Sequence, residues 1–160
     1  MDDALYRLAE ETGLALKAKG WMLATAESCT GGWVGEAVTA VSGSSSWYDR
    51  GFITYTNESK QEMLGVSAQT LARHGAVSEA TVREMASGVL LRSQAGISLA
   101  ISGIAGPSGG SPDKPVGTVC FAWAVRGGAV KSECCLFPGD RREVRLQAVE
   151  KALRGVLTQM

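Results

Sequence analysis

The sequence predicts one α/β domain over residues 1–160, in which helices cover both faces of a mixed, mostly parallel sheet of about five strands. Short apolar runs alternate along the chain with longer segments of helical periodicity. Glycine-rich segments follow two of these runs. A short glycine turn joins the last two runs, and such a hairpin requires one antiparallel strand.

In the first half of the chain, short apolar or alternating runs predict strands, and amphipathic or small-residue segments predict helices. The predicted strands cover residues 21–24 and 51–56. The predicted helices cover residues 2–19, 33–41, 58–64 and 67–73, with a longer one after the cap Ser78. Gly20 and Gly65 should end the first and third helices, and Asn57 should cap the third at its start.

In the second half, residues 96–103 are apolar enough for a central strand. A loop over residues 102–115 follows, too rich in glycine and proline to be an ordinary connection. Residues 116–125 and 129–137 are predicted to form the hairpin, and Asp140 to cap a terminal helix.

The sequence TAESCTGG, residues 25–32, lies at the predicted turn between the first strand and the helix that follows it. Backbone N–H groups at a helix start have no internal partners, so this turn can hold an anion or a developing oxyanion. Ser28 and Cys29 put a hydroxyl and a thiol beside that site, and two glycines leave its backbone open to a ligand. The alternative is that Ser28 or Thr30 only caps the helix.

Lys60 lies in the first turn of the third predicted helix, where the helix dipole disfavours a cation. Such local inconsistencies often mark functional positions, and a solvated surface lysine is the alternative. If burial lowers its pKa, a neutral lysine can accept the proton of Ser28. Tyr55, two residues before the Asn57 cap, is close enough in sequence to share that proton network.

Ser28, Lys60 and the loop at residues 106–110 all follow predicted strands. Ligands of such sheets bind beyond the carboxyl ends of the strands. The loop also offers backbone N–H groups and Lys114 to a phosphate. Together these groups suit a phosphorylated small molecule that carries an electrophilic carbon.

Composition and motifs argue against several classes of protein. Sixteen basic residues balance sixteen acidic ones, so general affinity for nucleic acid is not expected. No apolar run reaches the roughly eighteen residues that span a membrane, and no basic, apolar leader is recognisable, so a cytoplasmic location is expected. The phosphate-binding motif G-x-x-x-x-G-K-[ST] is absent, and no G-x-G-x-x-G follows the first strand.

The cysteines and the single histidine predict neither a disulfide nor a metal site. Cys120, Cys134 and Cys135 are expected to be small buried residues, with the last two pointing to opposite sides of a strand. No spacing is C-x-x-C, and a disulfide framework is not expected. His74 precedes a glycine at a helix end and is expected to cap that helix or lie on the surface.

Six motifs, in order along nearly the whole chain, resemble those of the CinA C-terminal domain family. They are TAESCTGG (25–32), YTNESK (55–60), GAVSE (75–79), SGIAGP (102–107), KPVGT (114–118) and FPGDR (137–141). This family includes stand-alone nicotinamide mononucleotide amidohydrolases. The resemblance implies a three-layer α/β/α fold and hydrolysis of the nicotinamide amide to nicotinate mononucleotide and ammonia. It also implies a role in pyridine nucleotide recycling, with neither a metal nor an organic cofactor.

Carried over position by position, the resemblance makes Ser28 the nucleophile and Tyr55 and Lys60 its proton-transfer partners. The implied oxyanion and substrate-binding group is Cys29, Thr30, Gly31, Gly32 and Asn57. The phosphate end of the mononucleotide is assigned to Gly106, Ser108, Gly109, Gly110 and Arg141. Ser108 stands where the family usually has glycine, a departure that bears on affinity more than on activity.

Two other hypotheses stay open. In one, Cys29 is the nucleophile, since a helix N-terminus can acidify a thiol. In the other, the chain is a non-catalytic nucleotide-binding or competence-associated partner domain of the same fold. A homodimer is expected, with the exposed face of the late hairpin as a candidate surface.

Overall fold

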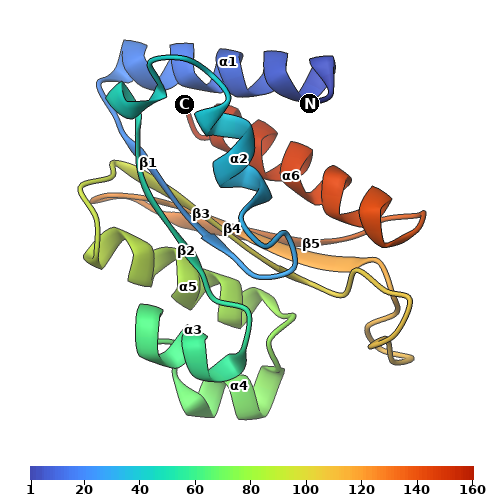
Figure 1. Ribbon diagram of the computed structural model, residues 1–160. Coiled ribbons are helices and arrows are strands. Elements are labelled where there is room, and N and C mark those ends of the chain that lie inside the picture. The colour runs from blue at the N-terminus through green and yellow to red at the C-terminus, as the bar shows by residue number, and fades with distance from the viewer.

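The computed structural model describes all residues, 1–160, as a five-stranded sheet between two groups of helices (Figure 1). The strands are β1 (Leu23–Glu27), β2 (Tyr48–Ile53), β3 (Ile97–Gly103), β4 (Thr118–Val125) and β5 (Val130–Leu136), in the spatial order β2-β1-β3-β4-β5. β1 pairs in parallel with β2 and β3, whereas β4 is antiparallel to both β3 and β5. The predicted mixed sheet with one opposed strand is therefore confirmed.

Six α-helices and one short 3-10 turn complete the fold: α1 (Asp3–Lys19), α2 (Trp33–Thr39), η1 (Ser44–Ser46), α3 (Asn57–Leu64), α4 (Ala68–His74), α5 (Glu79–Leu91) and α6 (Arg141–Thr158). Figure 1 shows α1, α2 and α6 above the sheet and α3, α4 and α5 below it. Each layer buries its own apolar cluster against the sheet. No helix combines the length and the apolar character needed to cross a membrane.

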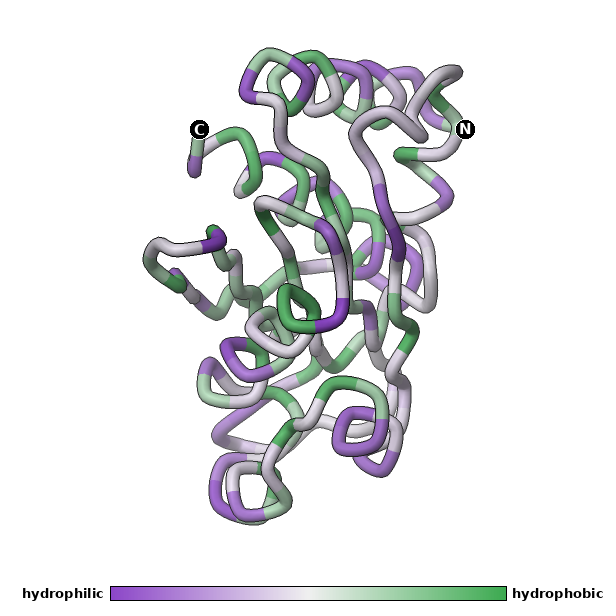
Figure 2. Tube along the Cα trace, turned by 90° about the vertical axis from the view of Figure 1, so that its left-hand side faces the viewer, coloured by the Kyte–Doolittle hydropathy of each residue, from purple (hydrophilic) through white to green (hydrophobic).

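Amphipathic periodicity explains why the outer helices pack as they do. Along their turns in Figure 2, hydrophilic and hydrophobic residues alternate, so that one side of each helix can face the sheet. The strands β1, β3 and β4 are buried almost throughout, as expected for strands covered on both faces. The predicted caps Gly20, Ser78 and Asp140 are confirmed.

The first two strands differ in position from the prediction. β1 runs to Glu27 rather than ending at residue 24, and all five of its residues are buried. β2 ends at Ile53 rather than at residue 56, because the chain there turns into a capping box. Thr56 accepts the Ser59 N–H and Ser59 accepts the Thr56 N–H in return, so Thr56 is the cap of α3. The prediction that Asn57 caps this helix is wrong.

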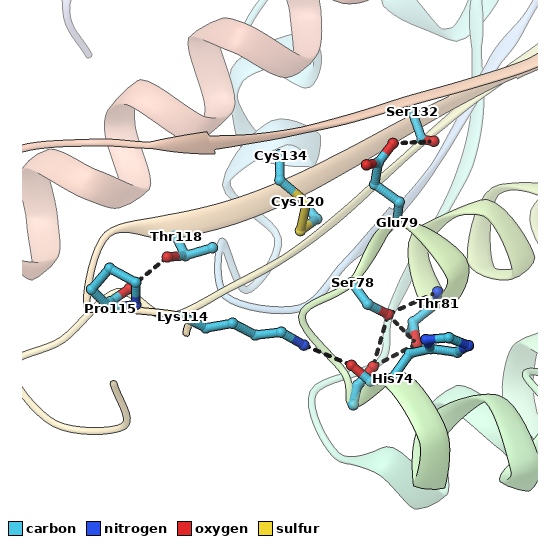
Figure 3. Close-up of a disulfide and its surroundings, with 11 residues drawn as sticks. His74, Ser78, Glu79, Thr81, Lys114, Pro115, Thr118, Cys120, Ser132 and Cys134 are labelled. Carbon is cyan, nitrogen blue, oxygen red and sulfur yellow. Dashed lines mark hydrogen bonds between the residues drawn. A yellow bond between two sulfur atoms is a disulfide. The ribbon is translucent and has the colours of Figure 1, made fainter. Parts of the chain in front are cut away.

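The expectation that the chain has no disulfide is also wrong. Cys120 on β4 and Cys134 on β5 lie directly opposite each other across the antiparallel pair, with Cα atoms 4.0 Å apart, and they form a disulfide (Figure 3). A separation this short is typical of the pairs that do not exchange backbone hydrogen bonds. Cys120 is buried as predicted, whereas Cys134 is exposed on the edge strand. Strand register decides this pairing, and spacing along the sequence does not reveal it.

Candidate active site

A cavity of about 230 Å³ lies where the parallel strands β1 and β3 end and the chain leaves β2. Ser28 follows β1, Lys60 comes from the helix after β2, and Ser102 and Gly103 end β3. The full lining is Ser28, Cys29, Tyr55, Lys60, Ala76, Val77, Ser102, Gly103, Ala105 and Arg141. The structure thus brings Ser28 and Lys60 together at this edge of the sheet, as predicted, whereas the third predicted segment, residues 106–110, contributes no residue to the lining.

Lys60 and Ser28 are in direct contact inside this cavity. The Lys60 Nζ lies 3.0 Å from the Ser28 Oγ, 2.8 Å from the Thr54 carbonyl oxygen and 3.4 Å from that of Tyr55. Only 1% of the Lys60 surface is exposed, and no carboxylate pairs with the amine. Burial lowers the pKa of Lys60 from 10.5 to about 8. The alternative of a solvated surface lysine is therefore wrong.

Neither Ser28 nor Thr30 caps α2. The helix starts at Trp33, its cap is Gly32, and no side chain bonds the free N–H groups from the cap position. The Ser28 hydroxyl is the partner of Lys60, and the Thr30 hydroxyl donates to the Glu27 carboxylate at 2.6 Å. The structure therefore leaves Ser28 available for chemistry.

Glu27 is a functional residue that the sequence reasoning missed. Its buried carboxylate accepts the N–H groups of Gly32, Val34 and Gly35 at 3.2, 2.9 and 3.1 Å, besides the Thr30 hydroxyl. The anion site at the start of α2 is thus filled by the protein itself. A carboxylate a few residues before a helix start is the signal that could have revealed this, because helix N-termini attract anions.

The N–H groups around Ser28 are therefore used differently from the prediction. The Gly31 N–H donates to the Ser28 carbonyl at 3.0 Å and the Gly32 N–H to Glu27, so neither is free for an oxyanion. The N–H groups of Cys29 and Thr30 have no acceptor within the protein. Of these two residues, only Cys29 lines the cavity. A free N–H donor therefore belongs to Cys29, the residue that follows Ser28.

Arg145 of α6 holds the same turn from the opposite side. Its Nε donates to the Cys29 carbonyl at 2.9 Å and its Nη2 to the Thr30 carbonyl at 3.1 Å, and its guanidinium lies 5.4 Å from the centre of the Trp33 ring. More than a hundred residues separate Arg145 from this turn along the chain. No local sequence signal could have found this contact.

Arg141, predicted for the phosphate end of the substrate, lies at the rim of the cavity. Its Nη1 donates to the Gly106 carbonyl at 3.0 Å and its Nη2 to the Tyr55 hydroxyl at 3.3 Å. The Tyr55 hydroxyl thus lies on Arg141 and not on the Ser28–Lys60 pair, which only its backbone carbonyl approaches. Like Lys60, Arg141 is a cation in the first turn of a helix, where the dipole disfavours it.

A second cavity of about 640 Å³ adjoins the first and shares Ala105 and Arg141 with it. Its other lining residues are Pro107, Val116, Gly139, Asp140 and Arg142. The two cavities therefore meet at Ala105 and Arg141, with the Ser28–Lys60 pair in the smaller one and Arg142 in the larger.

Several predicted site residues lie outside both cavities. Ser108, Gly109 and Gly110 are exposed beyond the cavity wall, and so is Asn57 on the outer side of α3. The Lys114 Nζ donates to the His74 carbonyl at 2.6 Å and so ties the loop to the end of α4 (Figure 3). His74 itself is exposed, which confirms the surface position predicted for it.

The Cys29 thiol is not acidified. Burial raises the pKa of Cys29 to about 11, although the nearby Arg145 acts in the opposite direction. The hypothesis that the helix N-terminus acidifies this thiol therefore has no support here, since Glu27 already occupies that terminus. Nowhere in the chain do three or more His, Cys, Asp or Glu side chains gather in a way that could hold a metal ion.

The chain matches a known protein family over nearly its whole length. The family model of the CinA C-terminal domain matches residues 5–160. The chain is 54% identical to the nicotinamide-nucleotide amidohydrolase PncC of Escherichia coli K12, over 99% of this chain and 96% of that protein. It is 46% identical to the Pseudomonas putida protein of the same name, over 97% and 96% of the two chains.

Solved structures are also similar to this chain over nearly its whole length. The competence/damage inducible protein CihA from Agrobacterium tumefaciens is 43% identical, with a TM-score of 0.96 over 99% of this chain and 96% of that one. The competence damage-inducible protein A from Klebsiella pneumoniae is 44% identical, with a TM-score of 0.93 over 97% and 96%. With the family model covering nearly every residue, the chain belongs to the CinA C-terminal domain family.

Proposed function

We propose that residues 1–160 form a single amidohydrolase domain that hydrolyses the carboxamide of nicotinamide mononucleotide to nicotinate mononucleotide and ammonia. The names of the near-full-length relatives support the substrate and the reaction. The observation that carries the proposal is the buried contact of 3.0 Å between the Lys60 Nζ and the Ser28 Oγ. A hydroxyl needs an adjacent base to act as a nucleophile, and a buried lysine can be that base.

The hydrogen bonds of Lys60 suit it to this role. In the neutral amine, two N–H groups can point at the carbonyl oxygens of Thr54 and Tyr55, which leaves the lone pair directed at the Ser28 hydroxyl. The Ser28 Oγ attacks the amide carbon while its proton passes to Lys60. The same proton then goes to the departing nitrogen, which leaves as ammonia. Water, deprotonated by Lys60, then attacks the acyl carbon, and Lys60 returns this proton to the departing Ser28 Oγ, which releases nicotinate mononucleotide.

The developing oxyanion needs hydrogen-bond donors that are already in place. We assign this role to the Cys29 N–H, which has no acceptor within the protein and belongs to the residue after the nucleophile. The Ser102 hydroxyl, on the same cavity wall and without a hydrogen bond of its own, is a second candidate donor. Gly31 and Gly32 then act on the shape of the turn instead of on the oxyanion.

The remaining lining residues suit the rest of the mononucleotide. Ala76 and Val77 give the pyridine ring an apolar wall beside the reacting carbon. Arg141 sits between the two cavities, where its guanidinium can bind a phosphate, and Tyr55 and Gly106 orient it. The exposed residues 108–110 then lie beside the phosphate-binding part of the site without lining it. We further propose a place for this enzyme in pyridine nucleotide recycling and its assembly as a homodimer.

The test is ammonia release from nicotinamide mononucleotide by the wild type and by Ser28→Ala, Lys60→Ala and Lys131→Ala. Lys131 is an exposed lysine on β5 that lines neither cavity, and it serves as the matched control. We expect turnover by the wild type and the control, and a loss of roughly a thousandfold or more in the other two, as for other nucleophile–base units. Thermal melts establish that each variant is folded.

Two results would contradict the proposal. A folded wild type that binds the mononucleotide without releasing ammonia would favour the non-catalytic binding domain. Retention of activity in Ser28→Ala, with its loss in Cys29→Ala and substrate-protected inactivation by iodoacetamide, would make the thiol the nucleophile.

A further inference from the structure

Arg145 lines neither cavity of the proposed site, yet it makes two short hydrogen bonds to the turn that carries the nucleophile. Hydrogen bonds from a guanidinium to carbonyl oxygens are charge-assisted and stronger than neutral ones. The side chain is half-buried and lies on the Trp33 ring, which limits its freedom. The position of its guanidinium is therefore well fixed relative to α6.

We propose that Arg145 is a positioning residue for amide hydrolysis, which aims the Cys29 N–H at the developing oxyanion through the peptide groups of residues 28–31. This inference rests on the proposed function. Its basis is the connected set of backbone contacts that begins at the Arg145 guanidinium and ends beside the Ser28 hydroxyl.

The connection can be followed one peptide group at a time. The C=O and N–H of a trans peptide point in opposite directions, and the only cis bond in the chain is Gly106–Pro107. Because Arg145 holds the Thr30 C=O on the side of α6, the Gly31 N–H points back toward the turn, where it donates to the Ser28 C=O. That carbonyl shares its peptide plane with the Cys29 N–H, which must then point the other way.

Glu27 completes the arrangement from the sheet side. Its carboxylate accepts hydrogen bonds from the Thr30 hydroxyl and from three N–H groups at the start of α2, while Arg145 donates to the carbonyls of Cys29 and Thr30. The turn is thus held through its acceptors on one side and its donors on the other. Without Arg145, two carbonyls lose their partners and the peptide planes become free to rotate.

This role predicts a specific kinetic effect. The Cys29 N–H contacts the oxyanion, which exists fully only in the transition state, so misaiming it should lower kcat with little change in KM. Removal of an oxyanion donor costs about 10²–10³ in kcat, and a misaimed donor should cost less. We expect Arg145→Ala to lower kcat by about ten- to a hundredfold and to change KM by less than about threefold.

The experiment compares the wild type, Arg145→Ala, Arg145→Lys and Arg154→Ala. Arg154 is the matched control, an exposed arginine of α6 paired with Glu150 on the surface at 3.6 Å. Guanidinium chloride at low millimolar concentration should restore part of kcat in Arg145→Ala and leave the control unchanged. Arg145→Lys, which keeps the charge but reaches one carbonyl at a time, should fall between the wild type and Arg145→Ala.

A second readout separates this inference from the proposed substrate. The rate at which a fluorophosphonate labels Ser28 depends on the nucleophile and its oxyanion donors but not on the mononucleotide. Slower labelling in Arg145→Ala, with guanidinium rescue, would support the inference even if the wild type released no ammonia. The inference would be overturned if folded Arg145→Ala or Arg145→Lys kept the wild-type kcat and labelling rate. It would also be overturned if only KM changed, or if guanidinium did not restore the lost kcat. A wild type that is neither active nor labelled would overturn it as well.

Discussion

At the scale of single residues, the site depends on one buried amine held without a counter-charge. The Lys60 Nζ has three hydrogen-bond partners, all uncharged oxygens, and burial lowers the pKa of Lys60 to about 8. A lysine in water would be almost fully protonated at neutral pH and useless as a base. In the proposed mechanism, burial makes the amine a usable base by removing water from around it, at the expense of stability.

The pH dependence of activity follows from this pKa. The neutral amine is the active form, so kcat/KM should rise with pH and level off above an apparent pKa near 8. The measurement is the rate of ammonia release from pH 6 to 10. Lys60→Arg, which stays protonated throughout, should remain inactive even at pH 9. A wild-type profile that is flat between pH 6 and 9 would contradict a role for Lys60 as the base.

The same pKa makes stability depend on pH. Because the pKa of Lys60 is lower in the folded state than its ordinary value of 10.5, the unfolded chain binds more protons between pH 8 and 10.5. The contribution of this group to the free energy of unfolding is therefore unfavourable below pH 8 and is relieved as pH rises toward 10.5.

At the scale of elements, the start of α2 is held by a carboxylate from the neighbouring strand. Glu27 ends β1 and receives the N–H groups of three residues of the turn and helix. A helix of only seven residues is marginal by itself, so this contact decides where it begins. The strand, the nucleophile turn and the helix are therefore coupled through one side chain.

Glu27→Gln tests this coupling. The amide keeps one oxygen, which can still accept from Thr30, Gly32 and Val34, but its NH₂ group cannot accept, so the Gly35 N–H loses its partner at a cost of about 1–3 kcal/mol. We expect the free energy of unfolding at pH 7 to fall by about that amount and kcat to fall with it. Glu36→Gln, an exposed change in the same helix, should have little effect on either. Equal stability of the two variants in urea would contradict this account of the α2 start.

The hairpin of β4 and β5 carries a second element-scale prediction. The Cys120–Cys134 disulfide closes a loop of 14 residues, for which chain entropy predicts about 3 kcal/mol of stabilisation. Dithiothreitol should therefore lower the melting temperature of the wild type. Cys134→Ser should melt at the temperature of the reduced protein and be insensitive to dithiothreitol, whereas Cys135→Ser should remain sensitive. A wild type unaffected by the reductant would show that the bond contributes nothing to stability.

Most of the elements could be predicted from sequence, because periodicity and caps are local. From the residues alone, the site was predictable at Ser28, which follows a strand, and at Lys60, a cation in a first helical turn. Arg141 was identified only through the family resemblance. Contacts that depend on strand register or on segments distant in the sequence could not be predicted. Examples are the Cys120–Cys134 disulfide and the hydrogen bonds of Arg145. Asn57 was wrongly predicted to cap α3 because Thr56 and Asn57 are adjacent and both residue types are common helix caps.

At the scale of the whole molecule, the site depends on how closely the layers pack. Lys60, which contacts Ser28, is carried by α3, and a glycine of α5 allows α3 to approach α5 closely. Gly88 of α5 faces the Leu64 carbonyl at the end of α3, and a Cβ atom added there would collide with that backbone oxygen. The opposite layer has a similar contact, where Gly155 of α6 faces the Trp123 ring.

Gly88→Ala should therefore be destabilising, although alanine is favoured over glycine in a helix by about 1 kcal/mol. A backbone carbonyl cannot rotate away like a side chain, so α3 must move, at a cost of about 1–3 kcal/mol beyond that gain. Because α3 carries Lys60, kcat should also fall, since a shift of about 1 Å in a catalytic group can cost a hundredfold. Ser87→Ala, an exposed change at the adjacent position, should be neutral or slightly stabilising. If Gly88→Ala matched Ser87→Ala in urea unfolding and in turnover, the spacing of α3 and α5 would not be what aligns the lysine with the serine.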